Sequence, residues 1–160
     1  MVILGIRDII KKFPTSLPKE FEEIIGKRKG LGKRDYLRAI HDDILEGHKP
    51  GIFLSYVRSL ELFDNDIFSI WKRKKNLSCL IMNYLMATAI LKSGKFAVKD
   101  LSLKWTLIMY FHPHQYIRVR IGDNEYINVD PWAAAVGLHF GEVAEGFNYL
   151  NFLTMKKPAS

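Results

Sequence analysis

The spacing of apolar residues divides the chain into a helical first half and a second half in which apolar and polar residues alternate. Apolar side chains recur every three to four residues in most of the first half, which predicts amphipathic helices. The predicted helices cover residues 4–13, 18–25, 35–46, 51–62 and 66–74. Ser16 is expected to cap the second of them, which has acidic residues in its first turn.

The most apolar segment of the chain is residues 76–91, NLSCLIMNYLMATAIL. It is apolar around its whole circumference, which predicts a buried helix. Ser93-Gly94 is expected to end this helix. The only cysteine of the protein, Cys79, lies in its first turn.

After Gly94 the pattern changes to that of strands. The apolar and aromatic run at residues 104–111 is typical of an internal strand. Residues 115–121 and 126–130 alternate on either side of a Gly-Asp-Asn turn, which predicts a hairpin. A further short helix or strand is expected around residues 147–152.

Composition and charge limit the class of protein. The 160 residues suit one domain with a core, and 48% apolar and 26% charged residues are ordinary for a globular protein. The formal net charge is +7, and 16 of the 24 Lys and Arg lie in residues 1–75 against 11 of the 17 acidic residues. This basic half permits a nucleic-acid partner without any motif that specifies one. Without a secretory signal or a long apolar run, we expect a cytoplasmic protein that does not span a membrane.

Residues 26–34, GKRKGLGKR, are expected to form a basic, glycine-rich loop. Such a loop is superficially similar to a phosphate-binding loop. Five residues separate Gly26 from Gly32, however, and Arg34 occupies the place where Ser or Thr would bind magnesium. The segment is therefore interpreted as a solvated loop.

Cys79, His114 and Asp130 together suggest nucleophilic chemistry. A helix N-terminus and an adjacent imidazolium stabilise a thiolate, which is the reactive form of cysteine. His114 begins the first strand of the predicted hairpin and Asp130 ends the second, so the turn brings both to one end of the sheet. If Ile121 lies beside Ile127, the two side chains share a face. Asp130 would then orient His114, and His114 would activate Cys79.

Each of these residues also has a purely structural interpretation. A single cysteine in an apolar helix is often a small buried hydrophobe, a histidine at a strand end is often exposed, and Asp before Pro often begins a turn. His112 is an alternative base. His112 and His114 could also form a metal site with Asp130 or His139. One cysteine excludes an internal disulfide and a multi-thiolate metal site.

With these residues identified, the sequence resembles the transglutaminase-like superfamily of papain-type cysteine hydrolases. The similar features are a cysteine that opens a buried helix, Cys79 to Gly94; a His114-Gln115-Tyr116 strand; and Asp130-Pro131 after a hairpin turn. Together they extend over roughly residues 52–132. The family often has Gly-Asp before the cysteine, where this chain has Leu77-Ser78, and Trp where it has Tyr116.

The resemblance implies an α+β fold with a helical N-terminal half and a Cys-bearing helix packed on a small antiparallel sheet. Residues 1–50 would be a helical extension and residues 51–160 the transglutaminase-like core. The implied activity is that of a cysteine protease or related thiol hydrolase or acyltransferase, which acts on peptide or glutamine amide bonds without a cofactor or metal. Papain-like enzymes also stabilise the oxyanion with an upstream side chain. The candidates for that role are Asn76, Trp71 and Tyr56.

Two other outcomes stay open at this point. The departure at Leu77-Ser78 is compatible with a non-catalytic binding or scaffold domain that keeps the fold. An arylamine N-acetyltransferase uses a similar triad, but such enzymes are larger and have an Arg-rich approach to the cysteine.

Overall fold

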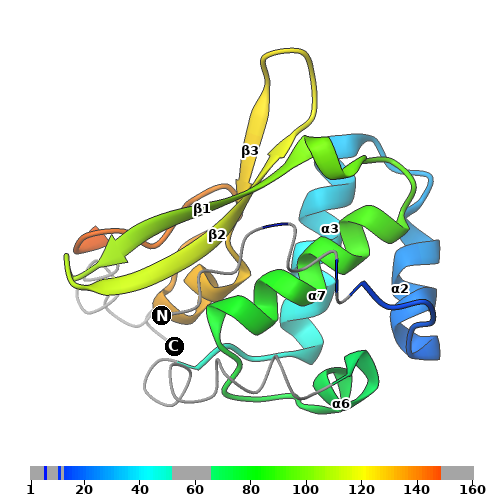
Figure 1. Cartoon of the computed structure of the whole chain (residues 1–160), viewed down its shortest axis with the longest axis horizontal. Coiled ribbons are helices and arrows are strands. Elements are labelled where there is room, and N and C mark those ends of the chain that lie inside the picture. Colours follow the sequence, from blue (N-terminus) through cyan, green and yellow to red (C-terminus); the bar gives the residue numbers. More distant parts are fainter. Residues whose placement is uncertain (1–5, 7–10, 12, 52–65, 149–160) are drawn as a thin grey trace, which may run out of the picture.

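Helices and a small antiparallel sheet make up an α+β fold (Figure 1). The computed structural model describes residues 13–51 and 66–148, together with Ile6 and Lys11. Within these residues the α-helices are α2 (Lys19–Arg28), α3 (Lys33–Gly47), α6 (Ile67–Lys72) and α7 (Cys79–Lys92). Two short 3-10 helices, η1 (Val98–Asp100) and η2 (Pro131–Val136), flank the strands β1 (Leu101–Ile108), β2 (His112–Arg120) and β3 (Tyr126–Val129).

The central helix α7 lies between the other helices and the sheet (Figure 1). All its residues from Ile81 to Ile90 are buried, as the apolar pattern predicts. Ser78 is its N-cap and accepts a hydrogen bond from the Ile81 amide. The helix ends at Lys92, and Gly94 adopts the left-handed conformation (φ 74°) that favours glycine. The predicted buried helix is therefore confirmed, with Cys79 as its first residue.

The sheet has the order β1-β2-β3, with both neighbouring pairs antiparallel. The hairpin of β2 and β3 is confirmed. Its register differs by two residues from the predicted one, because Val119 rather than Ile121 lies opposite Ile127. A shift of two residues keeps every side chain on its predicted face.

The strand predicted at residues 104–111 is confirmed as far as Ile108, but the prediction that it is internal to the sheet is wrong. The strand begins earlier, at Leu101, and β1 is an edge of the sheet, whereas β2 is central. The apolar and aromatic residues of this segment indicate a strand that is buried on both faces. Instead, Leu107, Tyr110 and Phe111 are exposed where the β1–β2 hairpin projects beyond α7 (Figure 1).

The helical N-terminal half is confirmed for α2, α3 and α6, with two corrections. The N-cap of α2 is Pro18, and no side chain caps this helix, so Ser16 does not have the predicted role. The predicted basic loop is also shorter. Helix α2 continues through Gly26 to Arg28, and α3 starts at Lys33. Basic residues at the end of α2 suit the helix dipole, which explains why they extend the helix.

Several predictions concern residues that the structure does not describe. They include most of the helices at 4–13 and 51–62, and part of the element at 147–152. The division at residue 50 stays a prediction, although the main core contains residues from both sides of it, such as Phe21 and Ile40 with Leu85 and Val119. Among the described residues, no helix has the length and apolar character needed to cross a bilayer.

Candidate active site

His114 and Asp130 form a buried pair at the end of the β2–β3 hairpin. His114 lies near the start of β2 and Asp130 directly follows β3. Nε2 of His114 is 2.7 Å from Oδ2 of Asp130. Neither residue is more than 3% exposed. The antiparallel pairing that the sequence predicts thus brings these two side chains together.

The carboxylate of Asp130 is held by three donors. Oδ2 accepts from the Ala144 amide (3.1 Å) as well as from His114, and Oδ1 accepts from the Ala133 amide (3.1 Å). The hydrogen bond from the Ala133 amide makes Asp130 the N-cap of η2. Asp130 is therefore fixed in position from two sides, by the start of η2 and by the segment around Ala144.

Cys79 begins α7 beside this pair. Its side chain is 8% exposed and packs in a small apolar cluster that does not belong to the main core. The buried members of this cluster are Ile108, Trp132, Ala133, Val136 and Ala144. Two of them, Ala133 and Ala144, are also the residues whose amides bind Asp130. The thiol and the carboxylate therefore share neighbours.

The electrostatics of His114 connect it to both partners. Burial acts to lower the pKa of His114, but the hydrogen bonds and charges of Asp130 and Cys79 raise it from 6.5 to about 9. Nδ1 of His114 is buried and has no fully formed hydrogen bond to a described residue. Because Nε2 is directed at Asp130, Nδ1 is the ring nitrogen that remains for Cys79, whose thiol is one of the groups that raise the pKa of the ring.

This arrangement determines which ring nitrogen can accept a proton. The neutral ring donates from Nε2–H to Asp130, which leaves the lone pair of Nδ1 for the thiol. Transfer of the thiol proton to Nδ1 would give a thiolate and an imidazolium, and the carboxylate of Asp130 stabilises the imidazolium. Such a transfer would make Cys79 a nucleophile in a buried, water-poor environment.

The three oxyanion candidates have different positions. Trp71 donates its indole N–H to Glu20 Oε2 (3.1 Å) and stacks on Phe21, so this donor is committed elsewhere and the proposal for Trp71 is corrected. Asn76 is exposed, with a left-handed backbone (φ 58°), three residues before Cys79. Tyr56 lies outside the described residues. The amide of Cys79 is in the first turn of α7, where helix amides lack intrahelical acceptors.

Sequence reasoning missed two supporting residues. The Trp132 ring lies 5.0 Å from the His114 ring, and its indole N–H donates to the Gly51 carbonyl (2.9 Å). Trp132 thus covers the histidine and ties it to the segment before α6. The Ala144 amide was missed as well. The position of Trp132 next to Asp130-Pro131 was visible in the sequence, whereas nothing in the pattern pointed to Ala144.

The alternatives with His112 receive no support. His112 pairs with Ile108 across β1 and β2 and packs its ring on Phe111, whereas the histidine that contacts Asp130 is His114. In the part of the chain that the structure describes, no three His, Cys, Asp or Glu residues are grouped so that they could hold a metal ion. The predicted metal set with His139 is therefore not formed there.

Comparison with known proteins adds no identification. No family model, curated protein or solved structure matches this chain. The chemistry of the site must therefore be argued from its own residues.

Proposed function

We propose that this protein is a transglutaminase-like, papain-type thiol hydrolase or acyltransferase that acts on amide bonds of a protein or peptide. The observation that carries this proposal is the buried His114 ring. Its Nε2 lies 2.7 Å from Asp130 Oδ2, and Cys79 is one of the groups that raise its pKa. A cytoplasmic location, where thiols stay reduced, would suit a free cysteine nucleophile.

The departure from the family before the cysteine is compatible with this function. Ser78 stands where the family often has Asp, and it caps α7 through the Ile81 amide. Ser and Asp are both favoured N-cap residues, so either one can start the helix at the cysteine. Leu77 is buried in the main core, and its carbonyl accepts from the Gly51 amide (3.0 Å). The backbone before Cys79 is thus fixed without the family's glycine.

The proposed reaction has two steps. The Cys79 thiolate attacks the amide carbonyl, and the His114 imidazolium gives its proton to the leaving amine, which produces a thioester. In the second step water or an amine gives a proton to His114 and attacks the thioester, which restores the thiol and releases an acid or a new amide. Asp130 keeps the ring oriented throughout. Amides in the first turn of α7 would stabilise the oxyanion.

Alkylation of the single cysteine tests the proposal directly. Iodoacetamide labelling of Cys79, followed by mass spectrometry across pH 5 to 10, should remain fast well below pH 8.5, the usual pKa of a free cysteine. His114→Ala should slow labelling at pH 6 by about tenfold or more. His139→Ala removes an exposed histidine and serves as the control. Labelling with a midpoint near pH 8.5 that does not respond to His114→Ala would refute the thiolate–imidazolium pair.

A non-catalytic binding domain with the same fold is the second candidate. The observation that favours it is the burial of Cys79, only 8% exposed within its apolar cluster. This candidate predicts that Cys79 resists iodoacetamide at every pH until the protein is unfolded by urea. Labelling of the native protein at neutral pH would exclude it.

A further inference from the structure

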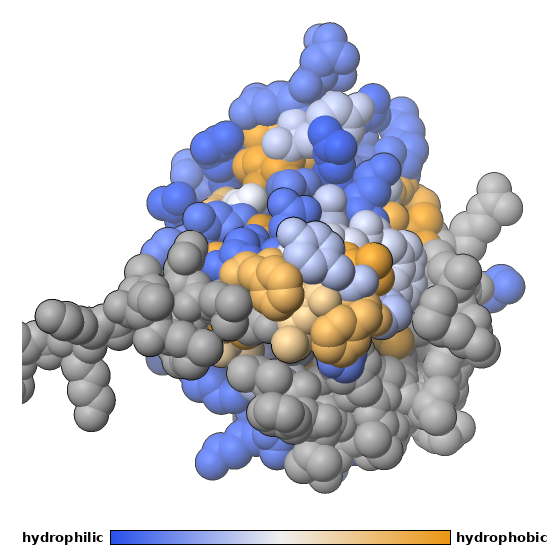
Figure 2. All heavy atoms as spheres, turned by 90° about the vertical axis from the view of Figure 1, so that its left-hand side faces the viewer, coloured by the Kyte–Doolittle hydropathy of each residue, from blue (hydrophilic) through white to orange (hydrophobic). Residues whose placement is uncertain are grey.

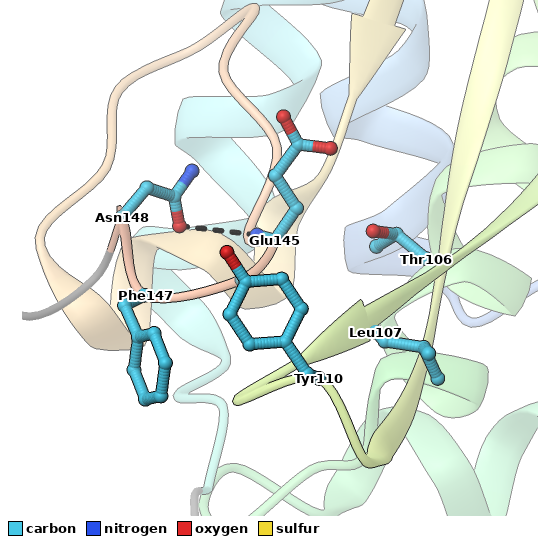
Figure 3. Close-up of a pocket in the computed structure, with 7 residues that line it drawn as sticks. Thr106, Leu107, Tyr110, Glu145, Phe147 and Asn148 are labelled. Atoms are coloured by element: carbon cyan, nitrogen blue, oxygen red, sulfur yellow. Dashed lines mark hydrogen bonds between the residues drawn. The ribbon is translucent and has the colours of Figure 1, made fainter.

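A pocket of about 480 Å³ opens between the end of β1 and a turn near the C-terminal end of the described chain (Figure 3). Its volume falls within the range of about 300 to 1,000 Å³ that is typical of ligand sites. The residues that line it are Thr106, Leu107, Tyr110, Glu145, Gly146, Phe147 and Asn148. Figure 2 shows hydrophobic side chains gathered on this side of the molecule, and Leu107, Tyr110, Phe111 and Phe147 are exposed.

Both walls of the pocket are continuous with the candidate active site. In the β1 wall, Thr106 lies directly opposite His114 in the β1–β2 ladder, and paired residues of neighbouring strands have adjacent side chains on the same face. In the other wall, Glu145 follows Ala144, whose amide binds Asp130. Ile108 and Ala144, each next to a lining residue, belong to the same apolar cluster as Cys79. A group held in this pocket would therefore lie beside the catalytic histidine.

The pocket is built before any ligand binds. Met109 and Tyr110 both have left-handed backbone angles (φ 53° and 61°), which cost residues other than glycine about 1 to 2 kcal/mol each. Two hydrogen bonds with Gly146 hold this turn. The Met109 amide donates to the Gly146 carbonyl (2.7 Å), and the Gly146 amide donates to the Leu107 carbonyl (2.8 Å). The strained turn places the Tyr110 ring against Phe147, with 5.2 Å between centroids. Strain that is maintained by surrounding contacts often marks functional positions.

The charge of the pocket indicates what it binds. Among the described residues that line it, Glu145 is the only charged one, and no described residue forms an ion pair with its carboxylate. Figure 3 shows the carboxylate above the space between Tyr110 and Thr106. The protein as a whole carries a net charge of +7, so an acidic group with two aromatic rings is a local exception. Carboxylates and aromatic faces both attract cations.

We propose that this pocket is a specificity subsite for a lysine or arginine side chain of the peptide substrate. The cationic group binds the Glu145 carboxylate, and its aliphatic stem packs on Tyr110 and Phe147. The inference rests on the proposed function, because it assigns the pocket to the substrate of Cys79. The pocket would select protein substrates that have a lysine or arginine close to the amide that reacts.

Titration with two amino-acid amides tests the subsite separately from the chemistry. Nα-acetyl-arginine methylamide and its neutral counterpart, Nα-acetyl-norleucine methylamide, are added to the ¹⁵N-labelled full chain. The arginine compound should shift the amide signals of Tyr110 and Gly146–Asn148, with an affinity that falls as salt is raised. Glu145→Gln should weaken its binding about fivefold. Glu142→Gln removes a charge from the same loop, outside the pocket, and should leave the affinity unchanged.

The outcomes separate the two proposals. Equal binding of the arginine and norleucine compounds would overturn the subsite, as would an arginine affinity that is insensitive to Glu145→Gln. Failure of either compound to shift these signals at tens of millimolar would overturn it too. The alkylation experiment gives an independent result for Cys79 and His114. If the arginine compound binds but His114→Ala leaves the alkylation rate of Cys79 unchanged, the pocket is a cation site and the catalytic proposal is refuted.

Discussion

Asp130→Asn should destabilise the protein more at pH 6 than at pH 9.5, because it removes a source of stability that depends on pH. The folded-state pKa of His114, about 9, lies above its unfolded value of 6.5. At about 1.4 kcal/mol per pKa unit, protonation of the buried ring contributes about 3 kcal/mol to the free energy of unfolding. Because the folded-state pKa is the higher one, this contribution is fully present below about pH 6.5 and is lost as pH rises through about 9.

The substitution removes the charge and replaces Oδ2 with an amide group that donates. His114 then loses its main cation-stabilising partner, so burial lowers its pKa and the ring is neutral in the folded protein. The Ala144 amide also loses its acceptor at 3.1 Å, which costs about 1 to 3 kcal/mol at any pH. The expected loss of stability is therefore about 4 to 6 kcal/mol at pH 6, and only about 1 to 3 kcal/mol at pH 9.5.

Urea unfolding of the wild type and the variant, followed by tryptophan fluorescence at pH 6 and pH 9.5, measures the two differences. Asp123→Asn changes an exposed acid in the hairpin turn and controls for the loss of one negative charge. A difference between wild type and Asp130→Asn that is the same at both pH values would refute the assignment of this stability to the His114–Asp130 pair.

Three further substitutions test the structure around the site by urea unfolding. Ser78→Ala removes the N-cap of α7 and should cost about 1 kcal/mol, whereas Ser78→Asp should cost little; equal effects would argue against the cap. Gly51→Ala should cost about 1 to 3 kcal/mol because its Cβ would lie 2.7 Å from the Asn76 Cα, and Gly47→Ala, with open space around it, should not destabilise. Asn83→Ala removes the buried hydrogen bond from Asn83 Nδ2 to the Gln115 carbonyl (2.7 Å) and should cost about 1 to 3 kcal/mol. A loss under about 0.5 kcal/mol would show that water replaces this contact.

The parts of the fold that follow a regular pattern were predictable. Helix α7 and the β2–β3 hairpin follow from periodicity and turn residues, because burial of one face or of a whole helix leaves a repeating signal. The juxtaposition of His114 and Asp130 follows from the same hairpin, since antiparallel pairing fixes which ends of the strands meet. The two-residue error in the predicted register did not affect the prediction of which side chains share a face, because a shift of two residues preserves the alternation.

The parts that depend on irregular segments were not predictable. The Ala144 amide reaches Asp130 from a loop without periodicity, and Trp132 reaches Gly51 across a large separation in sequence. The edge position of β1 was also hidden, because the exposed apolar and aromatic residues of β1 and of the turn after it have the composition of a buried strand. Helix starts are ambiguous in sequence as well: Ser16 is a favourable cap residue, but the N-cap of α2 is Pro18.

The short sequence separation within the His114–Asp130 pair has a consequence for folding kinetics. The two partners are only 16 positions apart in the sequence, whereas Cys79 belongs to a helix from earlier in the chain that must pack against them. Ordering a short loop costs less entropy, and local contacts generally form sooner. We therefore expect the pair to assemble with its hairpin before α7 docks. In refolding experiments with pulses of iodoacetamide, the fast reactivity of Cys79 should arise after hairpin amides are protected from hydrogen exchange, so that a reactive thiol would report the last stage of folding.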